Sequence, residues 1–292
     1  MQAKSILVLK FLALVVLYFI FFSFISATVL PRLQQTPANN EPFSALSALL
    51  IMSALNTAVL AYIAVRSQWS GWKLIATLAL VFFGVATVMP QIETAVFVRT
   101  LPSGFLFRLI LAGFLFSSVY AMLVVLLLGT NRAIESEAHT VSMTSSEWII
   151  RLSIAALSYV ILYFTFGYFV AWQSGAVRAY YGGGNLTGFF TELHKTWQAT
   201  PWLFPFQFLR GLLWSLLALP IIRMLRGHRF EKALVVGFLF AVVTSQLLLP
   251  NPLMPYEVRI RHLVETASSN FLFGCLVVWL LNSKHVETVT YP

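Results

Sequence analysis

A few charged residues of this chain lie inside or directly beside long apolar runs, where ionised groups are rare. Arg210 lies within the apolar run 202–225, about 12 Å from its start if the run is helical and rises about 1.5 Å per residue. Glu93 follows one apolar run and Glu265 precedes another. An ionised group among apolar residues is costly unless it is paired or hydrated. Arg210 should therefore need an acidic partner or water.

Further polar residues should share the end of the molecule where Arg210 lies. Glu257, Arg261 and Glu265 are spaced i, i+4, i+8, so on a helix they form one face and can pair in sequence. His262 lies three residues before Glu265 and could share a proton with it or with a bound group. Arg99 and Arg259 belong to the same region. We predict a polar cavity whose candidate lining residues are Glu93, Arg108, Arg210, Arg261, His262, Glu265 and Asn270.

Three kinds of role fit such a group of residues. The charges could be structural ion pairs that join two parts of the chain, or they could bind a solute, an ion or a lipid headgroup. They could also perform acid–base catalysis, for which a carboxylate and an imidazole are suitable groups. The residue types alone leave these alternatives open.

Metal and nucleophile chemistry have little support in the sequence. The 5 histidines are scattered along the chain, and no HExxH spacing occurs. No GxSxG turn is present, which is the typical setting of a hydrolase serine. We expect no metal and no cofactor, and we prefer a non-enzymatic function to an enzymatic one.

The elements that must position these residues are membrane helices. Of the 292 residues, 59% are apolar and 10% are charged, whereas soluble domains average about 25% charged residues. A bilayer's hydrocarbon region is about 30 Å thick, and each crossing helix needs about 20 apolar residues. The eight apolar runs are 5–29, 44–65, 72–90, 105–128, 148–172, 202–225, 230–249 and 267–281, the last of which needs to begin near Tyr256 or His262 to reach full length. The fold class is therefore an all-α, polytopic bundle of eight transmembrane helices.

The distribution of basic residues predicts the orientation. The net charge of +9 would suggest nucleic acid in a soluble protein, but here most of the Lys and Arg residues lie in short connections, which is the pattern of orientation signals. One short connection holds Arg223, Arg226, Arg229 and Lys232. We predict cytoplasmic N- and C-termini in a bacterial-type plasma membrane, with no nucleic-acid partner.

The chain divides near its middle into two similar halves. A polar segment, 130–147, separates a four-helix half, 1–129, from a second, 148–292. The segments 113–116 and 270–273 also resemble each other, which favours a 4+4 internal repeat. Apolar residues spaced by three and four near 186–199 predict an outer interfacial helix.

These patterns favour a transporter-like protein, or one that binds a solute or lipid, with a polar cavity open to the non-cytoplasmic side. A membrane scaffold or assembly subunit with structural ion pairs is the first alternative. An intramembrane lipid-modifying or hydrolytic enzyme is the second. The expected partners are the lipid bilayer and a small solute or a lipid headgroup.

Overall fold

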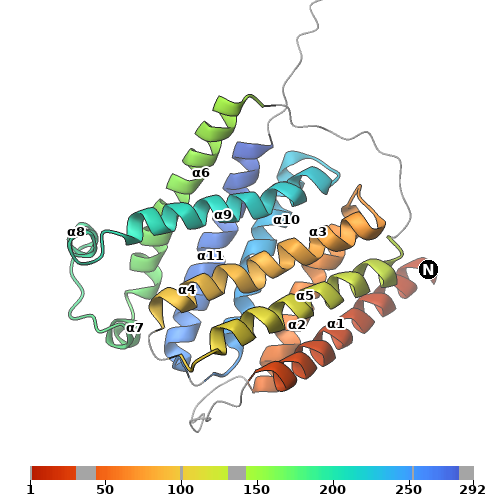
Figure 1. The fold of residues 1–292 in the computed structure, drawn as a ribbon, viewed down its shortest axis with the longest axis horizontal. Coiled ribbons are helices and arrows are strands. Elements are labelled where there is room, and N and C mark those ends of the chain that lie inside the picture. The colour runs from red at the N-terminus through yellow and green to blue at the C-terminus, as the bar shows by residue number, and fades with distance from the viewer. Residues whose placement is uncertain (1, 31–43, 99–100, 131–142, 252, 283–292) are drawn as a thin grey trace, which may run out of the picture.

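A computed structural model describes residues 2–30, 44–98, 101–130, 143–251 and 253–282. These residues form one bundle of helices packed side by side (Figure 1). Within them, eight helical segments are long and apolar enough to cross a membrane, so the predicted all-α polytopic bundle is confirmed. The elements are α1 (Gln2–Val29), α2 (Ala45–Arg66), α3 (Gly71–Phe83), η1 (Gly84–Val88), α4 (Met89–Phe97), α5 (Phe105–Leu128), α6 (Ser145–Phe166), η2 (Gly167–Ala171), α7 (Gly175–Tyr180), α8 (Phe189–Ala199), α9 (Leu203–Met224), α10 (Arg229–Val242), η3 (Val243–Leu248) and α11 (Tyr256–Leu281).

The outward faces of the spanning helices are apolar. Leu9 of α1, Leu80 of α3 and Ile161 of α6 are 69%, 61% and 65% exposed. A contiguous apolar surface of this extent marks contact with other apolar matter, which for a bundle of long helices is lipid. The bundle is therefore an integral membrane protein.

Polar side chains start two of the helices where their apolar runs begin. The Ser44 hydroxyl accepts a backbone N–H of the first turn of α2 at 3.1 Å. Thr144 and Glu147 form a capping box at the start of α6, in which the Thr144 hydroxyl accepts the Glu147 N–H at 3.3 Å and the Glu147 carboxylate accepts the Thr144 N–H at 2.8 Å. Such caps satisfy N–H groups that have no partner within the helix.

The third spanning helix continues past Pro90, and the sequence-based prediction that it ends there is wrong. It runs from Gly71 to Phe97 through α3, the π-helical segment η1 and α4. The N–H of Met89 bonds to the carbonyl of Gly84, five residues earlier, so the turn before the proline is widened. A π-turn removes the close i−4 carbonyl with which a proline ring collides in an α-helix. Glu93 consequently lies on a helix.

The four spanning helices of each half pack mainly on one another. In the first half α1 contacts α2 and α5, and α3 contacts α5; in the second α6 contacts α9 and α11, and α10 contacts α11. The halves meet where α2 packs on α10 and η3, and where α3 and η1 pack on α9. Helices in corresponding positions thus make corresponding contacts. The internal repeat itself stays a prediction.

Backbone hydrogen bonds join the two halves at the end of the bundle that carries the connections α2–α3 and α9–α10, which we call the turn end. Ser67 and Leu225 form an isolated antiparallel bridge. Beside it, the Gln68 N–H donates to the Met224 carbonyl at 2.7 Å, and the Arg226 N–H donates to the Arg66 carbonyl at 3.0 Å. These bonds close the turn end between the halves.

The opposite end carries α7 and α8, and we call it the α7–α8 end (left in Figure 1). Helix α8 covers most of the segment for which an interfacial helix is predicted, and its Phe190 side chain is 80% exposed. Arg99, the linker residues 131–142 and the terminal residues 283–292, which bear on the predicted linker and orientation, lie outside the described residues.

Candidate functional site

A cavity of about 2190 Å³ lies between the two halves and extends from the α7–α8 end into the bundle. It reaches Val85 of η1, Trp214 of α9 and Asn270 of α11, all of which lie well inside their spans. Ligand pockets for drug-sized molecules occupy about 300–1,000 Å³. This cavity is therefore large enough for a ligand bigger than an ion or a small solute.

Arg210 and Glu93 form an ion pair across the two halves at the wall of the cavity. The Arg210 Nη1 atom lies 2.5 Å from Glu93 Oε1 and donates to Gln207 Oε1 at 2.7 Å. The Arg210 side chain is only 4% exposed, whereas that of Glu93 is 34% exposed. The guanidinium is thus withdrawn from water, and its carboxylate partner is open to the cavity.

The surroundings of Arg210 include aromatic rings and an unused donor. Its guanidinium carbon lies 5.6 Å from the centre of the Tyr159 ring and 5.8 Å from that of Phe206. Both polar contacts use Nη1, and Nε is buried without a hydrogen-bond partner among the described residues. Rings at this distance stabilise a buried cation through their negative faces.

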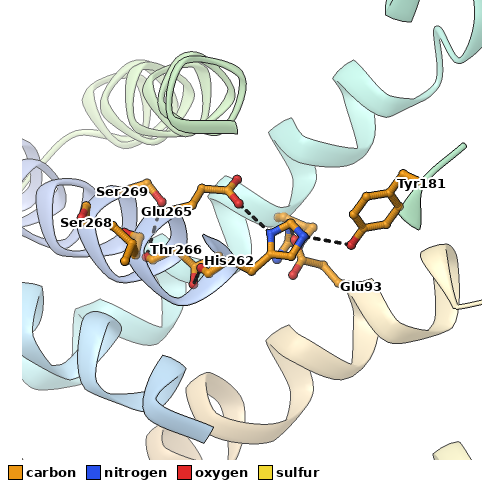
Figure 2. A network of polar contacts seen from close by, with 9 residues as sticks. Glu93, Tyr181, His262, Glu265, Thr266, Ser268 and Ser269 are labelled. Carbon is orange, nitrogen blue, oxygen red and sulfur yellow. Dashed lines mark hydrogen bonds and ion pairs between the residues drawn. The ribbon is translucent and has the colours of Figure 1, made fainter. Parts of the chain in front are cut away.

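His262 and Glu265 form a second polar pair about two turns into α11. Figure 2 shows the imidazole between the Glu265 carboxylate and the Tyr181 hydroxyl. Nδ1 lies 2.7 Å from Glu265 Oε2, and Nε2 lies 3.1 Å from the Tyr181 oxygen. With the imidazole proton on Nδ1, the ring donates to Glu265 and accepts from Tyr181. The predicted contact between His262 and Glu265 is therefore present.

The two polar pairs belong to one electrostatic environment. Glu93 interacts electrostatically with His262, and Tyr163 of α6 interacts with Glu93, Glu265 and Arg210. Residues of α4 in the first half and of α6, α9 and α11 in the second half therefore form the site.

Tyr181 and Glu192 line the cavity nearer its mouth, outside the spanning helices. Burial raises the pKa of the Tyr181 hydroxyl above its ordinary value, and the neighbouring Tyr180 raises it further. The hydroxyl of Thr187 donates to Glu192, which lowers the pKa of this carboxyl below its ordinary value. Lys195 Nζ also donates to Glu192, at 3.0 Å. Tyr181 therefore remains a neutral donor, and Glu192 is a paired carboxylate.

The structure brings five of the predicted site residues to the cavity. These are Glu93, Arg210, His262, Glu265 and Asn270. Arg108 and Arg261 are exposed and are not among its lining residues. Glu257, Arg261 and Glu265 all lie on α11 as predicted, but among the described residues no ion pair joins them, and Glu265 contacts His262 instead.

Arg259 has a structural role that the sequence does not indicate. Its side chain is fully buried, and Nη1 donates to the carbonyls of Leu248, at 3.5 Å, and Leu249. These carbonyls end η3, where backbone acceptors lack partners within the helix. Arg259 thus closes a helix end beside the cavity.

Sequence reasoning did not select Gln207 or Tyr181. Gln207 precedes Arg210 by three residues in the same apolar run, and a polar residue at that spacing is a usable signal for a shared helix face. Tyr181 directly follows α7 and contacts His262, which lies 81 residues later in the chain. No local pattern marks that contact.

The hydroxyl groups of α11 near His262 are occupied by backbone carbonyls of their own helix. Thr266 donates to the His262 carbonyl at 2.5 Å, and Ser268 donates to the Val264 carbonyl at 2.7 Å. Among the described residues, no three His, Cys, Asp or Glu side chains are grouped so that they could hold a metal ion. The carboxylate, imidazole and guanidinium groups at the site can exchange protons or bind charged and hydrogen-bonding groups.

At the turn end, a second ion pair joins the two halves outside the cavity. Arg66 Nε lies 2.7 Å from Glu231 Oε1, and the Tyr62 hydroxyl donates to the same carboxylate at 2.7 Å. Here both side chains retain contact with solvent, at 40% exposure for Arg66 and 17% for Glu231. This pair offers a matched comparison for Arg210 and Glu93.

Comparisons with protein-family models, curated proteins and solved structures find no match to this chain. The inference of function therefore rests on the geometry of the site.

Proposed function

We propose that this membrane protein is of the transporter type and takes an amphipathic ligand into the cavity between its two halves. The observation that carries the proposal is the cavity of about 2190 Å³, with an ion pair at its wall contributed by both halves. A scaffold held together by ion pairs needs no such cavity. The cavity therefore favours ligand binding over a purely structural role.

The composition of the lining supports an amphipathic ligand. Charged groups are concentrated around Arg210 and Glu265, whereas much of the remaining wall is apolar or aromatic. A ligand with a polar or charged group and a large apolar part would match both regions, because pockets combine apolar walls with a few polar groups that fix orientation.

The contrast between the two ends supports a transport role. The cavity opens at the α7–α8 end, and the backbone bridge between Ser67 and Leu225 closes the turn end. A site at the interface of two repeats, open to one side at a time, is the arrangement by which transporters give alternating access. We propose a 4+4 repeat, cytoplasmic termini in a bacterial-type plasma membrane, and a cavity that opens to the non-cytoplasmic side.

A second candidate function is lipid modification or hydrolysis with His262 as a general base. The 2.7 Å contact with Glu265 favours it, because a carboxylate orients an imidazole for proton abstraction. This candidate ranks lower because the α11 hydroxyls near His262 donate to backbone carbonyls. The His262→Gln variant would separate the two, since it should abolish catalysis but leave the cavity accessible.

The proposal can be tested by thiol labelling in intact cells. In a Cys275→Ser background, Ser269→Cys places a thiol in the cavity lining, and Leu157→Cys places one on the outward face of α6, where Leu157 is 55% exposed. A membrane-impermeant sulfonated maleimide should label the first variant and leave the second unlabelled, because thiols react as thiolates in water. An amphipathic ion added beforehand should slow the labelling.

Two results would contradict the proposal. If Ser269→Cys stays unlabelled in intact and in permeabilised cells, the cavity holds no water and no accessible ligand site. If it is labelled only after permeabilisation, the cavity opens to the cytoplasm and the proposed orientation is wrong.

A further inference from the structure

We infer that the ligand is a lipophilic organic cation, bound by the Glu265 carboxylate and the aromatic wall of the cavity in exchange for a proton. This inference rests on the proposed function and names the class of ligand that the cavity would take. It follows from the balance of charge in the cavity lining and from the residues near Glu265.

The ionisable lining residues contain more acidic than basic groups. Glu93, Glu192 and Glu265 line the cavity, with Arg210 and His262 as the basic residues. Arg210 compensates the charge of Glu93, with which it forms an ion pair at 2.5 Å, and Lys195 compensates the charge of Glu192 at 3.0 Å. The carboxylate left over is Glu265.

The polar partner that the structure gives Glu265 is His262. A neutral imidazole provides a hydrogen bond but no positive charge. The Glu265 side chain is 9% exposed, and a carboxylate in such surroundings is costly unless a cation or a proton balances it. The site therefore lacks one positive charge whenever His262 is neutral.

Aromatic side chains line the cavity beside the pair of His262 and Glu265, among them Tyr163, Trp172 and Tyr181. Tyr181 stacks on Trp172, with ring centres 6.5 Å apart, and its ring lies 5.6 Å from that of His262. Tyr163 interacts electrostatically with Glu265. Aromatic faces combined with a carboxylate are the groups that recognise ammonium and related organic cations. An anionic ligand would instead meet the uncompensated carboxylate, whose repulsion disfavours it.

A proton can supply the missing charge when the ligand is absent. Protonated His262 and ionised Glu265 form an ion pair at 2.7 Å, which balances the site. An arriving organic cation would be repelled by that imidazolium, so its binding favours release of the proton. Protons and the ligand therefore compete, and affinity for the cation should fall as the pH falls.

The other ionisable groups that face His262 and Glu265 do not reverse the pH dependence of cation binding. Glu93 of α4 and Arg210 of α9 compensate each other. The remaining facing groups are the phenols of Tyr159, Tyr163 and Tyr181, which are neutral in the range where histidine titrates. The proton exchange is consequently assigned to His262 and Glu265.

Two ions of nearly equal size and opposite charge test the inference. Tetraphenylphosphonium and tetraphenylborate would be offered to the full-length protein in nanodiscs, with empty nanodiscs subtracted to remove partitioning into lipid. The cation should bind about tenfold or more tightly than the anion, a difference of about 1.4 kcal/mol. Its affinity should rise between about pH 6 and about pH 8, where histidine loses its proton.

The Glu265→Gln variant should lose about tenfold or more of its affinity for tetraphenylphosphonium, because the compensating charge is removed. Glu231→Gln, which removes a carboxylate outside the cavity, should bind like the wild type. The wild-type comparison of the two ions needs no substitution, so it decides the charge preference even if Glu265→Gln fails to fold.

Equal or tighter binding of tetraphenylborate would overturn the cation assignment, and so would an affinity for the cation that is independent of pH. Binding of neither ion would overturn it as well. In each case the labelling of Ser269→Cys still decides whether the cavity is aqueous and open, so failure of this inference is distinguishable from failure of the proposed function.

Discussion

The ion pair between Arg210 and Glu93 predicts an unequal response to losing either partner. Glu93→Gln leaves a guanidinium that is 4% exposed with Gln207 as its hydrogen-bonding neighbour. Breaking a buried pair in this way costs about 3–5 kcal/mol. Arg210→Met instead leaves a carboxylate that is 34% exposed and can be hydrated by the cavity, so we expect a cost of about 1 kcal/mol or less.

The double variant tests whether the cost of Glu93→Gln comes from the unpaired guanidinium of Arg210. Because Glu93→Gln with Arg210→Met removes both charges, its stability should lie within about 1 kcal/mol of that of Arg210→Met alone. The assay is unfolding of the purified protein in mixed micelles with a rising fraction of denaturing detergent. A loss of about 3–5 kcal/mol lowers the ratio of folded to unfolded protein by about 150-fold to 5,000-fold.

The pair at the turn end is the control for this experiment. Arg66 and Glu231 also join the two halves at 2.7 Å, but they are 40% and 17% exposed. Exposed pairs contribute about 0–1 kcal/mol, so Arg66→Met and Glu231→Gln should have small and similar effects. If Glu93→Gln is no more destabilising than Arg210→Met, the reasoning from burial is refuted.

Two further predictions concern packing. Gly274→Ala should destabilise the crossing of α10 and α11 by about 1–3 kcal/mol, because a Cβ there would lie 2.8 Å from backbone atoms of Gly237. Gly184→Ala is the control in the same thermal-unfolding assay, and it should be neutral because its Cβ would meet nothing within 4 Å. Tyr120→Phe should cost about 0.6–1.7 kcal/mol in the same assay, because it removes the buried 2.6 Å hydrogen bond with Thr57; an unchanged midpoint would show that this bond does not stabilise the contact between α2 and α5.

The sequence was sufficient to predict the spanning helices, because the bilayer imposes one simple requirement on each of them. An apolar run of about 20 residues must form a helix when its backbone has no water to bond. The start of α11 at Tyr256 also agrees with the length argument. The boundary at Pro90 was wrong because the widened turn of η1 depends on the local hydrogen-bond register, which apolarity does not reveal.

The site could be predicted in part. Arg210 and Glu265 stand out because an ionised group in an apolar context needs a partner, and helical spacing associates His262 with Glu265. Periodicity could not decide which polar residues at one end of the bundle face inward, so Arg108 and Arg261 were selected although they are exposed. Tyr181 depends on the path of a connection, which only the folded chain defines.

The two ion pairs that join the halves differ in what a ligand can do to them. At the turn end, the ion pair of Arg66 and Glu231 is reinforced by the backbone bridge of Ser67 and Leu225, which no ligand in the cavity touches. At the cavity wall, the Glu93 carboxylate is open to the cavity and is the first-half partner of Arg210.

With the inferred organic cation bound beside Glu265, its positive charge would also attract the Glu93 carboxylate and repel Arg210, which remains the ion-pair partner of Glu93. The ligand would weaken the ion pair that joins the halves at the cavity wall and leave the ion pair at the turn end unchanged. Ligand binding would therefore be coupled to movement of one half against the other, because it changes the free energy of the ion pair between Arg210 and Glu93. The Glu93 and Arg210 variants measure that free energy.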